Sequence, residues 1–291
     1  MIPAAALTQW ATHAPWSNRA DVEQDLILSR LMVEIAGDDL LGPELAMRGG
    51  TCLHKVHMRE PLRYSDDLDY VRRAHSGFGR YADRLREIGQ NMGLTVQQTE
   101  PAGQMFHVVF EAESTEGLRP IRIKVETNIK EITPCFDDRL LAYKVDSTWW
   151  SGSADIRTFE LDELMGTKLR ALHQRKKGRD LFDLWYVLAN MGGDPDRILR
   201  AFHHYMGEKA FGYHDFANSL LHEKLGDEQF RSDISDLVVA LPPGYDIDAT
   251  ADLVVERLGP GLRGAPASDE LASGRWRETV PKRFKSVRAR K

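Results

Sequence analysis

The 291-residue sequence predicts an α/β (α+β) fold in two lobes, with a small mixed sheet in the first lobe and mainly helices in the second. Short segments of alternating apolar and polar residues dominate the first half, whereas apolar residues at helical spacing dominate after the run at 148–152. The length also suffices for two domains. We therefore expect a first lobe at 1–150, a helical lobe at 151–264 and a flexible basic tail at 265–291.

Composition places the chain among ordinary globular proteins, with 42% hydrophobic and 29% charged residues. It contains no run of 18 apolar residues, and its start lacks the charged and apolar segments of a secretory signal. Two cysteines, Cys52 and Cys135, are too few for a disulfide scaffold or a zinc cluster. We expect a cytoplasmic protein without membrane contact.

Charge is distributed unevenly along the chain. The whole chain carries −5, but its last 17 residues contain eight Lys or Arg and only one acid, Glu278. A basic tail on an acidic body either contacts nucleic acid phosphates or serves as a disordered, solubilising end.

Local patterns predict the elements of the first lobe in order. A helix over 20–36 is expected because apolar residues recur at helical spacing behind Asn18 and Asp21. A second amphipathic helix is expected over Gly79–Met92. Strands are expected at Glu44–Met47, from Asp67 into Val71, and at Leu94–Gln98, Met105–Glu111 and Ile121–Thr127.

The second lobe is predicted to contain a helix at about Asp162–His173 and another that begins at the basic turn Arg175–Asp180. Lys168 falls within the apolar stripe of the first of these helices, so its charge requires a partner. That partner is either a nucleoside triphosphate between the lobes or a core carboxylate. Asp183 lies on the face opposite the core stripe, where acids are usually solvated, yet it could orient Lys168. Asp180 fits a first-turn acid.

The strongest chemical signal runs from Gly49 to Asp69. Gly49 and Gly50 end a predicted strand with backbone that turns tightly and permits close approach, and Thr51 follows with a hydroxyl group. Asp67 and Asp69 share one face of the next strand. Paired carboxylates suit Mg²⁺, because this ion binds one or two carboxylates and completes its coordination shell with water and substrate phosphates. On the strand at 121–127, Glu126 is the candidate for a third carboxylate of the site. The alternative interpretation is that Glu126 is an ordinary solvent-facing acid.

The chain resembles the nucleotidyltransferases related to DNA polymerase beta, because glycines, a hydroxyl residue and an acid-x-acid strand follow one another in this order. The 15 residues between Thr51 and Asp67 exceed the usual gap, which points to an insertion at Arg59–Arg63. Further motifs narrow the resemblance: Arg63-x-Ser65-x-Asp67-x-Asp69, Lys168-Leu169-x-Ala171-Leu172 and Arg179-Asp180-x-x-Asp183-Leu184. Over residues 20 to 190 the chain resembles the AbiEii toxins of type IV toxin–antitoxin systems, which include the MenT toxins.

This resemblance implies a bilobed nucleotidyltransferase toxin that moves a nucleoside monophosphate from an NTP to RNA, at the tRNA 3′ end, and so blocks translation and growth. It implies Mg²⁺ at Asp67 and Asp69, with a two-metal site as an option, an essential Lys168 and Asp183, and a cognate AbiEi-like antitoxin encoded nearby. We assign nucleotide binding to Gly49, Gly50, Thr51, Arg63, Ser65 and Lys168.

RNA contacts are expected at a basic cluster beside the site, formed by Arg175, Lys176, Lys177 and Arg179. Two other readings of the sequence stay open. One is a nucleotidyltransferase that modifies a small molecule or a protein, and the other is a catalytically silent module that binds a nucleotide or RNA.

Overall fold

The computed structural model describes residues 2–74, 77–115, 120–266 and 275–280. The chain divides into two compact units. The first unit comprises Met1–Leu164 with Leu237–Ala240, and the second comprises Met165–Asp236 with Leu241–Lys291.

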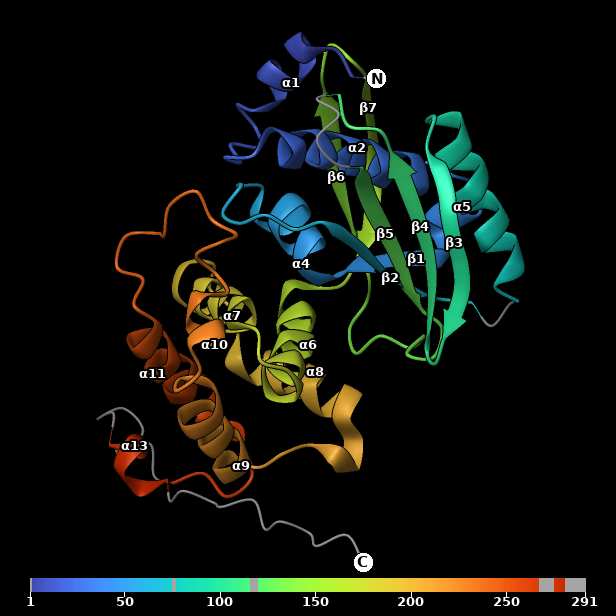
Figure 1. The fold of residues 1–291 in the computed structure, drawn as a ribbon. Helices are drawn as coiled ribbons and strands as arrows, with labels where there is room; N and C mark the ends of the chain where they lie inside the picture. The colour runs from blue at the N-terminus through green and yellow to red at the C-terminus, as the bar shows by residue number, and fades with distance from the viewer. Residues whose placement is uncertain (1, 75–76, 116–119, 267–274, 281–291) are drawn as a thin grey trace, which may run out of the picture. The chain divides into compact units, whose positions relative to one another are not determined.

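The first unit is built on a seven-stranded mixed sheet in the order β3-β4-β5-β2-β1-β7-β6 (Figure 1). Its strands are β1 (Leu45–Arg48), β2 (Asp67–Arg72), β3 (Thr95–Ala102), β4 (Met105–Ala112), β5 (Ile121–Asn128), β6 (Arg139–Asp146) and β7 (Ser151–Thr158). β2 lies in the middle, antiparallel to β1 and parallel to β5. Every residue of β2 therefore has neighbours on two sides.

Alternation along β2 separates its two faces. Leu68 and Tyr70 are buried in the core, whereas Asp67 and Asp69 are half-buried on the other face. The predicted period-2 strand is thus confirmed.

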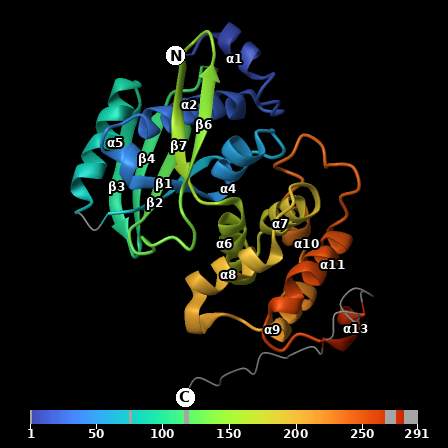
Figure 2. The same ribbon diagram turned by 180° about the vertical axis from the view of Figure 1, so that it is seen from behind.

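Helices cover the sheet of the first unit (Figure 2). Helix α2 (Arg19–Ala36) is capped by the Asn18 side chain, which accepts a hydrogen bond from the Ala20 amide. α2 packs against β5, β6 and β7, against α5 (Gly79–Asn91), and against the short α1 (Ala4–Trp10). The predicted helices at 20–36 and 79–92 are confirmed.

The hairpin β6–β7 was not predicted, and β7 begins where we expected the helical lobe to start. Only Val145 of β6 is buried, and only Ile156 and Thr158 of β7, so this edge hairpin lacks the apolar alternation of a core strand. The chain consequently stays in the first unit until Leu164.

The second unit is helical. It contains the main part of α6 (Leu161–Gln174), followed by α7 (Gly178–Asn190), α8 (Pro195–Met206), α9 (Tyr213–Asn218), α10 (Glu228–Ser232) and α11 (Ile247–Leu258). The two helices predicted from Asp162 and from the turn Arg175–Asp180 are confirmed as α6 and α7. α8 starts with the pattern expected of a helix N-terminus, since Asp194 caps it and Pro195 takes the first position. No helix of the described ranges is long and apolar enough to cross a membrane.

Part of the predicted flexible tail is packed. Trp276 in α13 (Trp276–Thr279) is fully buried, and its indole nitrogen donates to Oδ1 of Asp252 on α11 at 3.0 Å. Arg277 donates to the same oxygen at 2.8 Å. The remaining stretches of the predicted tail, 267–274 and 281–291, lie outside the described residues.

Replacing Trp276 by alanine tests this packing. We expect Trp276→Ala to lower the free energy of unfolding by about 3–5 kcal/mol, because a fully buried indole is lost. Glu278→Ala, an exposed change on the same short helix, should stay within about 0.5 kcal/mol of the wild type. Urea unfolding monitored by circular dichroism measures both values. Equal stability of the two variants would show that this segment contributes nothing to the fold.

Candidate active site

Three carboxylates gather on one face of the first unit's sheet. Asp67 and Asp69 lie two residues apart on β2, and Glu126 on β5 is the direct register partner of Asp69. Because β2 and β5 are parallel, the side chains of Asp69 and Glu126 project from the same face. The expected proximity of Glu126 to the two aspartates therefore holds in the structure.

Lys124 compensates the charge of this carboxylate face. It is the register partner of Asp67 on β5, and its Nζ lies 3.5 Å from Oδ2 of Asp67 and 3.1 Å from Oε1 of Glu126. Nε2 of His107, on β4, lies 3.1 Å from the same Glu126 oxygen. The strands thus bring two nitrogen-bearing side chains to the carboxylates.

The carboxylates repel one another, and this repulsion shows in the acid–base properties of the site. Burial and, to a smaller extent, the charges of Asp66, Asp69 and Glu126 together raise the pKa of Asp67 to about 6, against the opposing effect of Lys124. Burial lowers the pKa of Lys124, but Asp67 and Glu126 raise it by more. A cation beside these acids is therefore stabilised by them.

Gly49 is fitted to Asp69. It has φ +82°, and a Cβ atom at this position would overlap the Asp69 carboxylate. Glycine is therefore required at this position for two reasons, the positive φ and the close approach of the Asp69 carboxylate. The prediction that the glycine pair lets another group approach closely is confirmed. The pair does not form a simple turn, however, because it opens α4 (Gly49–Cys52), which continues as a π-helical turn, η1 (Leu53–Met58).

Three of the residues predicted to bind nucleotide lie at this helix: Thr51 belongs to α4, and Arg63 and Ser65 lie beside it. The Thr51 hydroxyl is hydrogen-bonded to the main-chain oxygen of Asp67 at 2.6 Å and to Oγ of Ser65 at 2.8 Å, and its side chain is buried. A Cβ at Gly50 would lie 2.5 Å from Nη2 of Arg63. In the described structure Thr51 thus ties α4 to the start of β2.

Lys168 sits in a buried ion cluster of the second unit. Its Nζ lies 3.1 Å from Oδ1 of Asp180 and 2.8 Å from Oδ2 of Asp183, and both carboxylates are completely buried. Arg175 also pairs with Asp180, at 2.7 Å. Burial raises the pKa of Asp180, but Lys168 and Arg175 lower it by more. The structure thus pairs Lys168 with Asp183, as expected, and shows that neither aspartate is solvated.

The predicted RNA-binding cations are all paired with carboxylates inside the second unit. Besides the Arg175–Asp180 pair, Lys176 lies 3.0 Å from Asp227, and Lys177 and Arg179 lie 3.6 and 3.8 Å from Asp233. Any anion that binds this cluster must compete with these carboxylates.

Sequence reasoning assigned no role to Lys124 and too small a role to Asp180. Lys124 could have been recognised, because it shares the polar face of β5 with Glu126 two residues away. The burial of Asp180 had no signal in the sequence, since it depends on how α6 and α7 pack.

Magnesium fits the donor set of the first unit. No group of three or more His, Cys, Asp or Glu side chains in the described parts of the chain is arranged to hold a metal ion. Mg²⁺ does not need such a cage, because one or two carboxylates with water and phosphate oxygens complete its shell. Asp67 and Asp69 supply two adjacent carboxylates, and the contact of Lys124 with Asp67 shows that a positive charge is accommodated beside them.

Comparisons with known proteins reveal similarities in sequence family and in fold. A family model described as nucleotidyl transferase AbiEii toxin, type IV TA system, matches residues 30–257. A search of curated proteins found no match. The fold is similar to that of MenT4, a nucleotidyltransferase toxin from Mycobacterium tuberculosis H37Rv, with a TM-score of 0.59 and 17% identity over 93% of this chain and 92% of MenT4. It is also similar to JHP933 from Helicobacter pylori, with a TM-score of 0.51 and 16% identity over 90% and 96% of the two chains.

Two glycine variants test the fit between Gly49 and Asp69. Gly93 also has a positive φ, +77°, but an added Cβ would meet nothing within 4 Å, so Gly93→Ala should cost only about 1–2 kcal/mol. Gly49→Ala adds an overlap with the Asp69 carboxylate, and we expect it to cost about 1–3 kcal/mol more. The difference is measured by urea unfolding. Equal costs would mean that the carboxylate moves aside freely.

Proposed function

Because the chain belongs to the AbiEii family of nucleotidyltransferase toxins of type IV toxin–antitoxin systems, we propose that it transfers a nucleoside monophosphate from an NTP to an RNA acceptor, the 3′ end of tRNA. An NTP substrate and an antitoxin partner follow from membership of the family. Magnesium dependence, the tRNA end as acceptor and the resulting block of translation and growth are parts of the proposal. We also propose that an AbiEi-like protein is the antitoxin.

The observation that carries the proposal is the carboxylate face of β2 and β5. Asp67 and Asp69 project together, Glu126 is paired in register with Asp69, and Gly49 is fitted against the Asp69 carboxylate. Phosphoryl transfer depends mainly on positioning and on neutralising charge, so a rigid set of acids beside a glycine pair suits this chemistry.

In the proposed reaction an acceptor hydroxyl oxygen forms a bond to the α-phosphorus, the bond from that phosphorus to the bridging oxygen breaks, and pyrophosphate leaves. Asp67 and Asp69 would hold Mg²⁺, which supplies Lewis acidity and neutralises phosphate charge. Glu126 accepts the proton of the attacking hydroxyl. Arg63, with Gly49, Gly50, Thr51 and Ser65, contributes to binding the triphosphate.

Lys168 and Asp183 act as a pair in this proposal. The lysine supplies positive charge to the triphosphate, and Asp183, 2.8 Å away, orients its Nζ. Because Asp180 and Arg175 complete the cluster, the ion pairs can hold the lysine in one rotamer.

RNA binding is proposed for Arg175, Lys176, Lys177 and Arg179. Their carboxylate partners weaken the cluster as a phosphate site, and each phosphate that the cluster does contact should add to the salt dependence of RNA affinity. A nucleotidyltransferase that acts on a small molecule or a protein is the alternative, and a silent binding module is a further one.

Incubation with labelled NTPs, Mg²⁺ and total tRNA tests the proposal. We expect labelled RNA from wild type and a loss of about 10²-fold or more in rate for Asp69→Asn, since a positioned charge is removed from the reacting centre. Asp66→Asn, an exposed neighbour, is the matched control and should keep most of the activity.

Three outcomes would contradict the proposal in different ways. No incorporation from any of the four NTPs argues against RNA transfer altogether. Label in a small-molecule or protein fraction selects another acceptor. Equal growth arrest by wild type and Asp69→Asn after induction favours the silent binding module.

A further inference from the structure

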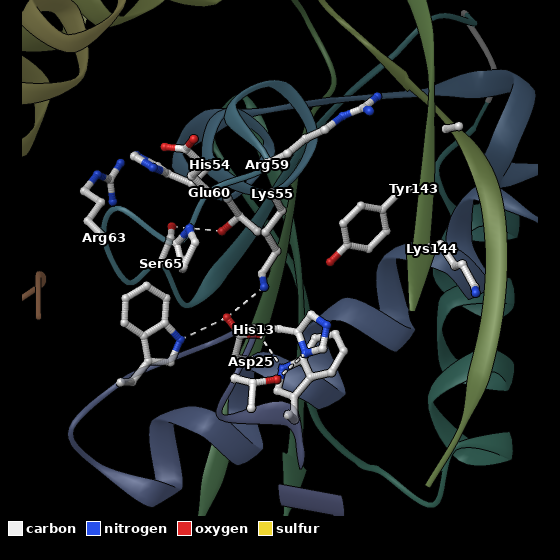
Figure 3. Close-up of a pocket in the computed structure, with 16 residues that line it drawn as sticks. His13, Asp25, His54, Lys55, Arg59, Glu60, Arg63, Ser65, Tyr143 and Lys144 are labelled. Carbon is white, nitrogen blue, oxygen red and sulfur yellow. Dashed lines mark hydrogen bonds and ion pairs between the residues drawn. The ribbon is translucent and has the colours of Figure 1, made fainter. Parts of the chain in front are cut away.

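A cavity of about 510 Å³ opens within the first unit, beside α4 (Figure 3). Its walls come from α1 and the segment between α1 and α2, from η1 and the loop after it, and from β6. Thr51, Arg63 and Ser65 form one side, whereas Asp67 and Asp69 are not among its lining residues. The cavity therefore adjoins the carboxylate face and shares these three side chains with the proposed triphosphate site.

Aromatic side chains in this cavity are fixed by a buried carboxylate. Oδ1 of Asp25 accepts a hydrogen bond from the Trp10 indole at 2.8 Å, and Oδ2 accepts one from the Trp16 indole at 3.1 Å. Tyr143 on β6 faces the cavity from the other side, with its hydroxyl donating to Oγ of Ser29 at 3.1 Å (Figure 3). Indole rings held in this way lose little entropy when a planar ring stacks on them.

Positive charge exceeds negative charge in the lining. Lys55, Arg59, Arg63 and Lys144 line the cavity together with two carboxylates, Asp25 and Glu60, and Lys144 is paired with Asp146 at 2.8 Å. Asp25 is already neutralised, because Nζ of Lys55 lies 2.7 Å from its Oδ2. A cavity that is locally cationic in a chain of net charge −5 favours an anionic ligand.

Arg59 has a backbone conformation that residues other than glycine rarely adopt. It ends η1 with φ +60°, and it is the one non-glycine residue with positive φ in the described ranges. Such a conformation costs an ordinary residue free energy that glycine would not lose. The side chain lies along the upper rim of the cavity, above Tyr143 (Figure 3).

We infer that this cavity binds a nucleotide, with its base against the Trp16 indole and its phosphate toward Arg59 and the neighbouring cations. Aromatic rings combined with cations are the usual means of holding an unstacked base and its phosphate. The volume lies within the range of small-ligand sites. Trp10, Trp16 and Asp25 precede residue 30, where the family match begins, so this wall is a feature of this chain beyond the matched region.

The bound nucleotide can be a free mononucleotide or one nucleotide of an RNA chain. The inference depends on neither the acceptor nor catalysis by the carboxylates. It is therefore tested in the Asp69→Asn background with EDTA, so that a failed transfer reaction and an empty cavity are distinguishable.

Calorimetric titration with AMP and with a 5′-phosphorylated RNA trinucleotide provides the test. We expect Trp16→Ala to weaken binding about 5- to 150-fold, the range measured for the loss of one stacked base. Trp16→Phe keeps a ring for stacking and should restore most of the affinity, although its hydrogen bond to Asp25 is lost. A trinucleotide that binds more than about tenfold tighter than AMP identifies RNA as the source, and similar affinities identify a free nucleotide.

The variant Arg59→Gly removes the charge of Arg59 while preserving the backbone conformation at this position. Because glycine adopts φ +60° freely, thermal stability should be unchanged or higher, while binding of both probes weakens and becomes less salt-dependent. Arg86→Ala, on the exposed face of α5, is the control and should bind like the parent. The inference is overturned if neither probe binds at millimolar concentration, or if binding is the same in Trp16→Ala, Arg59→Gly and the parent.

Discussion

The close approach of Gly49 to the Asp69 carboxylate is the constraint on which the site of the first unit depends. Only a residue without Cβ lets α4 begin at this distance from β2. The register of β2 against β5 then sets Glu126 beside Asp69 and Lys124 beside Asp67. The hydrogen bond from Thr51 to the main-chain oxygen of Asp67 holds helix and strand together. One steric contact and one strand register thus position Asp67, Asp69 and Glu126.

Both units offset their buried charges internally. In the first unit Lys124 contacts Asp67 and Glu126, and in the second Lys168 and Arg175 contact Asp180 and Asp183. Carboxylates that are already compensated can exchange one cation for another at a smaller cost than carboxylates that must first be desolvated. This property suits a site that binds its metal together with a triphosphate.

The sequence predicted most of the fold because α2, α5, α6, α7 and the strands β1 to β5 have patterned apolar faces. It could not predict β6 and β7, where few side chains are buried, or the packing of Trp276 on α11, which depends on a contact with Asp252. For the site, Asp67, Asp69 and Glu126 followed from alternation along strands, a local property. Asp180 and the cavity around Asp25 arise from contacts between distant segments, which no local pattern encodes.

The central claim, that Asp67 and Asp69 jointly hold a divalent cation with the triphosphate, is tested most directly by electron paramagnetic resonance of Mn²⁺ in the presence of a non-hydrolysable NTP analogue. The account predicts that wild type binds Mn²⁺ with the analogue, and that the double variant Asp67→Asn/Asp69→Asn binds at least about tenfold more weakly, because two ionised carboxylates are replaced by neutral amides. Unfolding curves of the two proteins establish that both are folded. Mn²⁺ affinity that is the same in the folded double variant and in wild type would contradict the account.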